Sequence, residues 1–257
     1  MNDYGFKIHF VASNWENVPE KFEELKSLYT HYNIEDANVI VALGGDGFML
    51  RTLHHYQEYK LPIYGMNLGS VGFLMNVFEK ENLYARIHKA QTIQLHPLQM
   101  KATTTENLVY EALAINEVAL RRSSRLAAKI QIDIDGTTKL DELVGDGVLL
   151  STAAGSTAYN LSVNGPIIPI SANLLALSPI SAFRPRRWKG ALLPHKAQVT
   201  FHVLQPEKRP VSAETDLSEI ANIKKVEIFE NRQISIQLLF DKKHNLEERI
   251  IAEQFLT

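Results

Sequence analysis

The chain has 257 residues, 45% of them hydrophobic, so it can bury one large core or two modest ones and is expected to fold as a globular protein. Its formal net charge of -2 gives no reason to expect a nucleic-acid partner, and the absence of cysteine excludes disulfides and thiolate metal sites. Because Asp3, Lys7 and His9 interrupt the first apolar residues and no apolar run approaches the roughly 20 residues of a membrane span, we expect a cytoplasmic protein without a secretory signal or membrane partner.

The first part of the chain, to about residue 75, alternates between strand and helix patterns. Strand patterns occupy residues 6–12, 39–43 and 61–69, and helical spacing of apolar residues covers 18–32 and 47–59. The run Val39–Leu43 is apolar on both faces, which is typical of a strand in a parallel sheet covered by helices. This alternation predicts an α/β domain with crossover connections.

The second half of the chain is predicted to be mainly strands. After Pro97 the apolar residues recur with a period of two, most clearly over residues 130–134, 199–203 and 234–240.

We therefore place a domain boundary near residues 92–97. This gives an α/β domain at 1–95 and a β-rich domain at 96–257. Residues 243–257 return to helical spacing, at Leu246, Ile250 and Phe255, and are expected to pack back on the first domain.

A glycine-rich loop joins the strand pattern at 39–43 to the next helix. Its sequence is Gly44-Gly45-Asp46-Gly47, and unobstructed backbone amides at a helix start can cradle a phosphate. A carboxylate inside an anion site is unfavourable unless it has a task, such as taking a proton from an attacking hydroxyl. Asp46 is therefore the candidate catalytic base, and Arg51 is a candidate phosphate contact. The alternative is a tight turn in which Asp46 caps the helix.

A second polar loop follows the apolar residues 148–150. Small hydroxyl and glycine residues between Ser151 and Thr157 allow close approach of a polar ligand, and Tyr159 offers a ring for base stacking. The alternative is an ordinary Ser/Thr-rich turn with a core tyrosine. A third candidate is the pair Asn116-Glu117, because polar residues within an apolar strand need partners that a ligand can supply.

Four segments taken together resemble the bacterial NAD kinases. They are GGDG at 44–47, NLGSVGFL at 67–74, NE at 116–117 and GDGVLLSTAAGSTAYNLSVNGP at 145–166. Their order and spacing agree with the family over nearly the whole chain. The first element also resembles loops of diacylglycerol kinases, sphingosine kinases and phosphofructokinases, whereas the last looks specific to NAD kinases.

The resemblance implies a fold and an activity. The fold would be NAD kinase-like, with a Rossmann-like α/β domain containing a parallel sheet, a β-sandwich-like second domain, and assembly into homodimers or homotetramers. The activity would be transfer of the terminal phosphate of ATP to the 2′-hydroxyl of the adenosine ribose of NAD, forming NADP, with Asp46 as general base. Mg2+ or another divalent cation would arrive with ATP, since the sequence shows no dedicated metal site.

The resemblance also implies ligand contacts. Donor phosphates would meet the loop glycines and the following arginine: Gly44, Gly45, Gly47 and Arg51. The dinucleotide would be bound by matching positions in both halves: Phe73, Asn116, Glu117, Asp146, Ala154, Thr157, Ala158, Tyr159, Asn160 and Ser162.

Two rival functions and several residues stay open. A lipid kinase would leave the segment 157–162 unexplained, and a non-catalytic NAD-binding sensor would have no need of Asp46. Asp216 is set aside because Leu217 replaces the glycine of an Asp-Gly turn common in the family. The motifs do not decide whether ATP or polyphosphate is the phosphate donor, or whether NAD or NADH is the preferred acceptor. No chemistry is assigned to His54 and His55. The basic residues Arg121, Arg122 and Arg184 are candidates for contacts with phosphates or with a neighbouring subunit, and the alternative is solvated surface charge.

Overall fold

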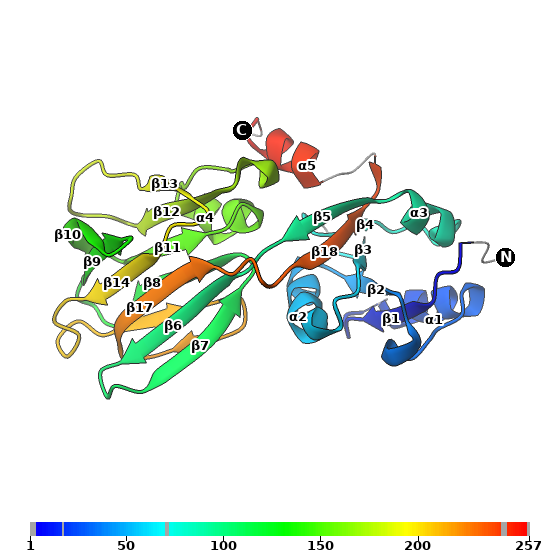
Figure 1. Cartoon of the computed structure of the whole chain (residues 1–257), viewed down its shortest axis with the longest axis horizontal. Coiled ribbons are helices and arrows are strands. Elements are labelled where there is room, and N and C mark those ends of the chain that lie inside the picture. The colour runs from blue at the N-terminus through cyan, green and yellow to red at the C-terminus, as the bar shows by residue number, and fades with distance from the viewer. Residues whose placement is uncertain (1–3, 17, 70–71, 243–245, 256–257) are drawn as a thin grey trace. The chain divides into compact units, whose positions relative to one another are not determined.

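Figure 1 shows the computed structural model of the chain, which describes residues 4–16, 18–69, 72–242 and 246–255. The chain forms two compact units. Unit 1 contains Met1–Leu95 and Ser235–Ala252, and unit 2 contains His96–Ile234 and Glu253–Thr257. Among the described residues, no helix is long and apolar enough to span a membrane.

Unit 1 is built around one sheet, which is parallel except at one edge. The strand order is β1-β2-β3-β18-β5, with β4 also paired to β3, and only β5 runs antiparallel to its neighbour. The strands are β1 (Ile8–Ala12), β2 (Val39–Gly44), β3 (Ile63–Asn67), β4 (Asn76–Val77), β5 (Gln91–Leu95) and β18 (Ile236–Phe240). All six residues of β2 are buried, as expected for a strand covered on both faces.

Unit 1 contains the helices α1 (Val18–Leu28), α2 (Asp46–Tyr56), α3 (Leu83–Lys89) and α5 (Leu246–Glu253), with 3-10 turns at Ile34–Asp36 and Gln57–Tyr59. Of these, α1 and α2 match the helices of the predicted alternation, whereas no prediction covers α3. Val18 and Leu25 of α1 bury their side chains in the same core as β1 and β2. The predicted α/β domain with a parallel sheet is confirmed.

Unit 2 contains two six-stranded antiparallel sheets. One has the order β10 (Thr137–Gly145), β9 (Ala128–Ile134), β14 (Val199–Val203), β17 (Ile223–Glu230), β6 (Leu98–Thr104) and β7 (Val109–Ala114). The other has the order β13 (Ala191–Pro194), β12 (Leu174–Ile180), β11 (Gly147–Ser151), β8 (Glu117–Arg122), β15 (Val211–Glu214) and β16 (Glu219–Ile220). Apolar residues of both sheets share one core, so the sandwich-like prediction is confirmed.

Short helical segments follow β11. They are the 3-10 turns Ala154–Thr157 and Ile170–Ala172 and the single helical turn α4 (Tyr159–Ser162). The helix α4 begins at Tyr159 and ends after four residues.

Two expectations need correction. The strand pattern at 234–240 was assigned to the second domain, but β18 pairs with β3 and β5 in unit 1, because its apolar residues fill a place in that sheet. Phe255 was expected on the apolar face of the last helix, but α5 ends at Glu253 and Phe255 is 79% exposed. Of the segment 243–257, residues 243–245 and 256–257 lie outside the described residues.

Candidate active site

Asp46 is the first residue of α2, and Gly45 occupies the N-cap position without a side-chain cap. The Asp46 carboxylate instead accepts hydrogen bonds from the Phe73 N–H at Oδ2, 2.7 Å, and from the Leu74 N–H at Oδ1, 2.9 Å. Burial raises the pKa of the Asp46 carboxyl, and the two amides and the charge of Arg249 oppose this rise. The capping alternative is therefore wrong, and Asp46 is a desolvated carboxylate held in a fixed orientation.

The three glycines around Asp46 have different neighbours. A Cβ atom on Gly44 would lie 2.9 Å from the Phe48 ring, and one on Gly45 would lie 3.0 Å from the Trp15 indole. Packing within unit 1 thus explains these two glycines. A Cβ atom on Gly47 would meet nothing among the described residues closer than the Arg51 Nη1 atom at 4.0 Å. Gly47 is exposed, so its missing side chain leaves room for a ligand.

Two other predicted residues of unit 1 lie beside this loop. Arg51 is exposed on α2, with its guanidinium carbon 6.0 Å from the centre of the Phe48 ring. Phe73 is partly buried and supplies one of the amides bound to Asp46. The structure therefore brings together the unit 1 residues selected from sequence.

In unit 2, Asn116 and Glu117 lie where β8 begins. Burial, and after it the negative charge of Asp216, raises the pKa of the Glu117 carboxyl to about 8, against a hydrogen bond from the Tyr159 backbone that lowers it. The Glu117 Oε2 atom is buried and has no hydrogen-bond partner among the described residues. A protonated carboxyl both donates and accepts hydrogen bonds, so Glu117 can bind a ligand hydroxyl without burying a charge.

Asp216 fixes the backbone in front of Glu117. Its carboxylate accepts hydrogen bonds from the Ile115 N–H at 2.5 Å and from the Asn116 N–H at 3.0 Å. Sequence patterns alone assign no role to Asp216, whereas the structure shows it as a support for the Asn116-Glu117 pair. The only sequence signal for this role is an acidic residue in the short connection between β15 and β16, which contains no glycine.

The polar loop after β11 is tied to the same backbone. The Thr152 hydroxyl donates to the Ile115 carbonyl at 2.7 Å and accepts from the Gly155 N–H at 3.0 Å. The Thr152 N–H donates to the Asn116 carbonyl at 2.9 Å. A Cβ atom on Gly155 would lie 2.3 Å from that same carbonyl oxygen, so only glycine permits this approach.

Tyr159 covers an outer sheet face. It packs with Val163 against Ala119, Leu149 and Ile180, whereas the neighbouring strand residues point into the main core of unit 2. Its side chain is only partly buried, so the ring is neither a core residue nor fully free.

Asn160 is fully buried, and its side chain is used within the loop. The Asn160 Nδ2 atom donates to the Ser156 carbonyl at 3.1 Å and to the Pro166 carbonyl at 2.9 Å, and its Oδ1 atom accepts from the Ser178 hydroxyl at 2.7 Å. Asn160 therefore orders the loop and presents no side-chain surface to a ligand. Of the other predicted positions here, Ala154 is buried, Thr157 and Ala158 are partly buried, and Ser162 is exposed.

Asp146 lies before β11, whereas the polar loop follows it. The five residues of β11 separate the two, or roughly 20 Å along the strand. The Asp146 Oδ1 atom accepts from the Arg122 Nε atom at 2.5 Å, and Arg121 pairs with Glu214 at 2.8 Å. These contacts give Arg121 and Arg122 ion-pair partners, and Arg184 is exposed.

Two residues near Asp46 could not be found from sequence motifs. Trp15 is 49% exposed and lies over Gly45. Arg249 of α5 donates to backbone carbonyls of the segment that binds Asp46. Neither belongs to a recognisable motif, since both come from chain segments remote from the glycine loop. Among the described residues, no group of three histidine or acidic side chains is arranged to hold a metal ion.

Comparisons with known proteins give a consistent family. The model of the ATP-NAD kinase N-terminal domain matches residues 7–92, and that of the ATP-NAD kinase C-terminal domain matches residues 115–209. An NAD kinase of Caulobacter vibrioides is 53% identical over 249 residues, covering 97% of this chain and 96% of the relative. An NAD kinase of Brucella suis is 51% identical over 255 residues, covering 99% of both chains.

Solved structures show the same fold. Yeast NADH kinase complexed with NADH has a TM-score of 0.76 at 21% identity, covering 97% of this chain and 87% of that one. An NAD kinase from Archaeoglobus fulgidus in complex with ATP has a TM-score of 0.73 at 22% identity, covering 96% of this chain and 98% of that one.

Proposed function

Because the chain belongs to the ATP-NAD kinase family and is thus an enzyme of the kinase class, we propose that it transfers the terminal phosphate of ATP to the 2′-hydroxyl of the adenosine ribose of NAD, forming NADP. The observation that carries the finer assignment is Asp46: a desolvated carboxylate, fixed by two backbone amides, at the start of the helix that follows a glycine loop.

We assign Asp46 as the general base for the acceptor hydroxyl. A carboxylate has about four acceptor positions, and two of those of Asp46 are taken by the Phe73 and Leu74 amides. Among the described residues no further hydrogen bond to this carboxylate is formed, which leaves the other positions for a ligand hydroxyl. Because burial raises its pKa, Asp46 is a stronger base than an exposed aspartate. Its fixed orientation reduces the entropy lost when the hydroxyl is aligned for attack.

The donor phosphates would lie at the start of α2. Backbone amides of the first turn have no helical acceptor and are attractive to anions. Gly47 leaves open space there, and the exposed Arg51 would neutralise phosphate charge. ATP would enter as its Mg2+ complex, since the described residues offer no metal-binding cluster of their own.

The dinucleotide would be bound by residues of unit 2. The Glu117 Oε2 atom, which has no partner among the described residues, suits a ribose hydroxyl, and the Asn116 amide suits a base or hydroxyl. The partly exposed Tyr159 offers an apolar surface, and Thr157, Ala158 and Ser162 are accessible beside it. Asp216 would hold the Asn116-Glu117 pair in place. Asn160 would act only by ordering the loop.

The test is NADP formation by the purified protein supplied with NAD, ATP and Mg2+, with the isosteric variant Asp46→Asn and the surface variant Asp141→Asn assayed in parallel. We expect turnover by the wild type and by Asp141→Asn, and a fall of about 100-fold or more in kcat for Asp46→Asn with little change in NAD affinity.

Other outcomes separate the rivals. NAD binding measured by calorimetry without any product would favour a sensor, and phosphorylation of a diacylglycerol or sphingosine extracted into organic solvent would favour a lipid kinase. Unchanged turnover by Asp46→Asn would remove the base assignment while leaving the kinase activity in place.

A further inference from the structure

The backbone between Gly72 and Met75 makes polar contacts on two sides. Its amides at Phe73 and Leu74 donate to Asp46, at 2.7 Å and 2.9 Å. Its carbonyls at Gly72 and Met75 accept from the Nη1 atom of Arg249, at 2.5 Å and 2.6 Å. Arg249 therefore contacts the same four-residue segment that holds Asp46.

One peptide unit is shared directly between the two side chains. The carbonyl of Gly72 and the N–H of Phe73 belong to the same planar amide, so that amide accepts from Arg249 and donates to Asp46. A charged donor on the carbonyl polarises the amide and strengthens its N–H as a donor. The guanidinium thus reaches the carboxylate through one rigid group.

The far end of this segment is fixed by Asn76, which directly follows Met75. The fully buried Asn76 side chain donates to the Gly65 carbonyl of β3 at 3.0 Å and to the Leu239 carbonyl of β18 at 2.9 Å, and it accepts from the Asp241 N–H at 2.8 Å. Met75 is therefore attached to the sheet of unit 1, and Arg249 supplies the contact at the Gly72 end.

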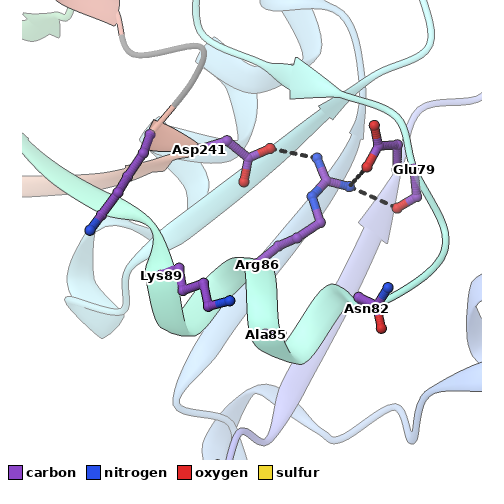
Figure 2. A pocket seen from close by; sticks show the side chains of 7 residues that line it. Glu79, Asn82, Ala85, Arg86, Lys89 and Asp241 are labelled. Atoms are coloured by element: carbon purple, nitrogen blue, oxygen red, sulfur yellow. Dashed lines mark hydrogen bonds and ion pairs between the residues drawn. The ribbon is translucent and has the colours of Figure 1, made fainter.

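Asp241 is itself anchored beside a surface cavity of about 570 Å³. Its carboxylate accepts from the Tyr64 hydroxyl at 2.8 Å and from Arg86 at 2.6 Å, and Figure 2 shows Arg86 extended between Asp241 and Glu79. This ion pair secures the chain just after β18. Five residues later α5 begins, with Leu246 and Ile250 buried one turn apart and Arg249 next to Ile250.

We propose that Arg249 is a positioning residue for Asp46, acting through the Gly72–Phe73 amide to hold the carboxylate where the acceptor hydroxyl arrives. This inference rests on the proposed function of Asp46. Burial raises the pKa of the Asp46 carboxyl, and the Leu74 and Phe73 amides and, after them, the Arg249 charge oppose that rise, so Arg249 acts on Asp46 both through the shared amide and through its charge.

The first experiment compares Arg249→Met, which keeps the volume but removes the donors, with Arg249→Lys, which keeps one charged donor. As a matched control, Arg209→Met removes another partly buried arginine, one that donates to the Ala127 carbonyl in unit 2. We expect Arg249→Met to lower kcat by about 10- to 100-fold with KM for NAD and ATP changed less than about threefold. Arg249→Lys should recover part of the loss, and Arg209→Met should keep kcat.

The second experiment repeats Arg249→Met in the Asp46→Asn background. If Arg249 acts through Asp46, the double variant should be no slower than Asp46→Asn alone, because the two losses are not additive. An equal further loss in that background, or unchanged kcat in the single variant, would overturn the proposal. Wild-type turnover by Asp46→Asn would instead remove the base assignment, a result that the Arg249 variants alone cannot produce. Thermal unfolding of each variant checks that it folds. If Arg249→Met does not fold, Arg249→Lys carries the test. The proposal would then be overturned if Arg249→Lys had the kcat of the wild type and if Asp46→Asn lowered kcat equally in both backgrounds.

Discussion

Asp46 in unit 1 and Asp216 in unit 2 make the same kind of backbone contact, but the contact has a different role in each unit. Each carboxylate accepts hydrogen bonds from two consecutive amides, Asp46 from Phe73 and Leu74, and Asp216 from Ile115 and Asn116. In unit 1 the backbone positions the carboxylate, which is the candidate reactive group. In unit 2 the carboxylate positions the backbone, and the candidate ligand-binding groups lie on the backbone that it holds.

The comparison shows that a carboxylate bound to amides has no fixed role. What distinguishes the two is their setting: Asp46 lies beside the open space at Gly47, whereas Asp216 lies next to a second carboxyl, Glu117, whose pKa it helps to raise. Loss of Asp46 should therefore affect chemistry, and loss of Asp216 should affect binding.

The largest effect is expected at the loop that Asp216 indirectly supports. In Gly155→Ala the new Cβ atom would lie 2.3 Å from the Asn116 carbonyl oxygen, a backbone atom that cannot move without disturbing Glu117. We expect a loss of about 2–3 kcal/mol in the free energy of unfolding and a fall of roughly 5 °C or more in Tm. NAD binding should be lost with it. Calorimetry measures both, and a Tm equal to that of the wild type would show that the loop adapts.

Asp216→Asn tests the comparison directly. The variant leaves two backbone amides without their charged acceptor, which costs about 1–3 kcal/mol in holding the Asn116-Glu117 pair. We expect KM for NAD to rise about tenfold while kcat changes less than about threefold, the opposite of Asp46→Asn. Glu219→Gln, an exposed change in the same hairpin, is the control. A fall in kcat at constant KM would break the distinction between the two carboxylates.

Glu117, the carboxyl next to Asp216, should make the stability of the folded protein depend on pH. Its pKa is raised to about 8 in the folded protein, so the stability that it contributes is fully present below its ordinary pKa and is lost as pH rises through about 8. Glu117→Gln mimics the neutral form. The Tm of the wild type should match that of Glu117→Gln near pH 5 and fall below it by roughly 3 °C or more near pH 9.

The control for this series is Glu111→Gln, which removes an exposed carboxyl from β7. If the Tm difference between the wild type and Glu117→Gln changes with pH no more than the difference for Glu111→Gln, Glu117 titrates normally.

The smallest effect on folding is expected at Gly47. A Cβ atom there meets no described atom closer than 4.0 Å, so Gly47→Ala should leave Tm within about 1 °C. If the space is used by a donor phosphate, KM for ATP should still rise about fivefold. Gly45→Ala is the matched comparison. Because its Cβ atom would lie 3.0 Å from the Trp15 ring, this variant should lower Tm. An unchanged KM for ATP in Gly47→Ala would place the phosphates elsewhere.

Sequence patterns were sufficient where function and local structure coincide. The alternation of strands and helices up to β3 follows from apolar periodicity, and Asp46 stands out because glycines surround it. The polar segment at 145–166 also stands out, because its glycine and hydroxyl residues are neighbours in the chain. In each case the residues that matter are close together in the chain.

What the sequence did not reveal depends on contacts between distant segments. Asp216 is 100 residues from Asn116, and Arg249 is 177 residues from Gly72. Both contact backbone atoms, and because nearly every residue type supplies these atoms, the type of the partner residue does not reveal the contact. Asn160 is the opposite case: the family resemblance implies a ligand contact, whereas its side chain is already hydrogen-bonded to Ser178 and two backbone carbonyls.

The position of β18 has a consequence for how the protein is made. This strand lies between β3 and β5, yet in the sequence it follows residues His96–Ile234 of unit 2. On the ribosome, the first 95 residues emerge without a central strand of their sheet, and β3 and β5 must wait until residues 236–240 have been synthesised. Such distant pairing slows folding and exposes strand edges in the meantime. The Arg249 contact forms later still, so the unit that carries Asp46 is completed only when nearly all of the chain has been translated.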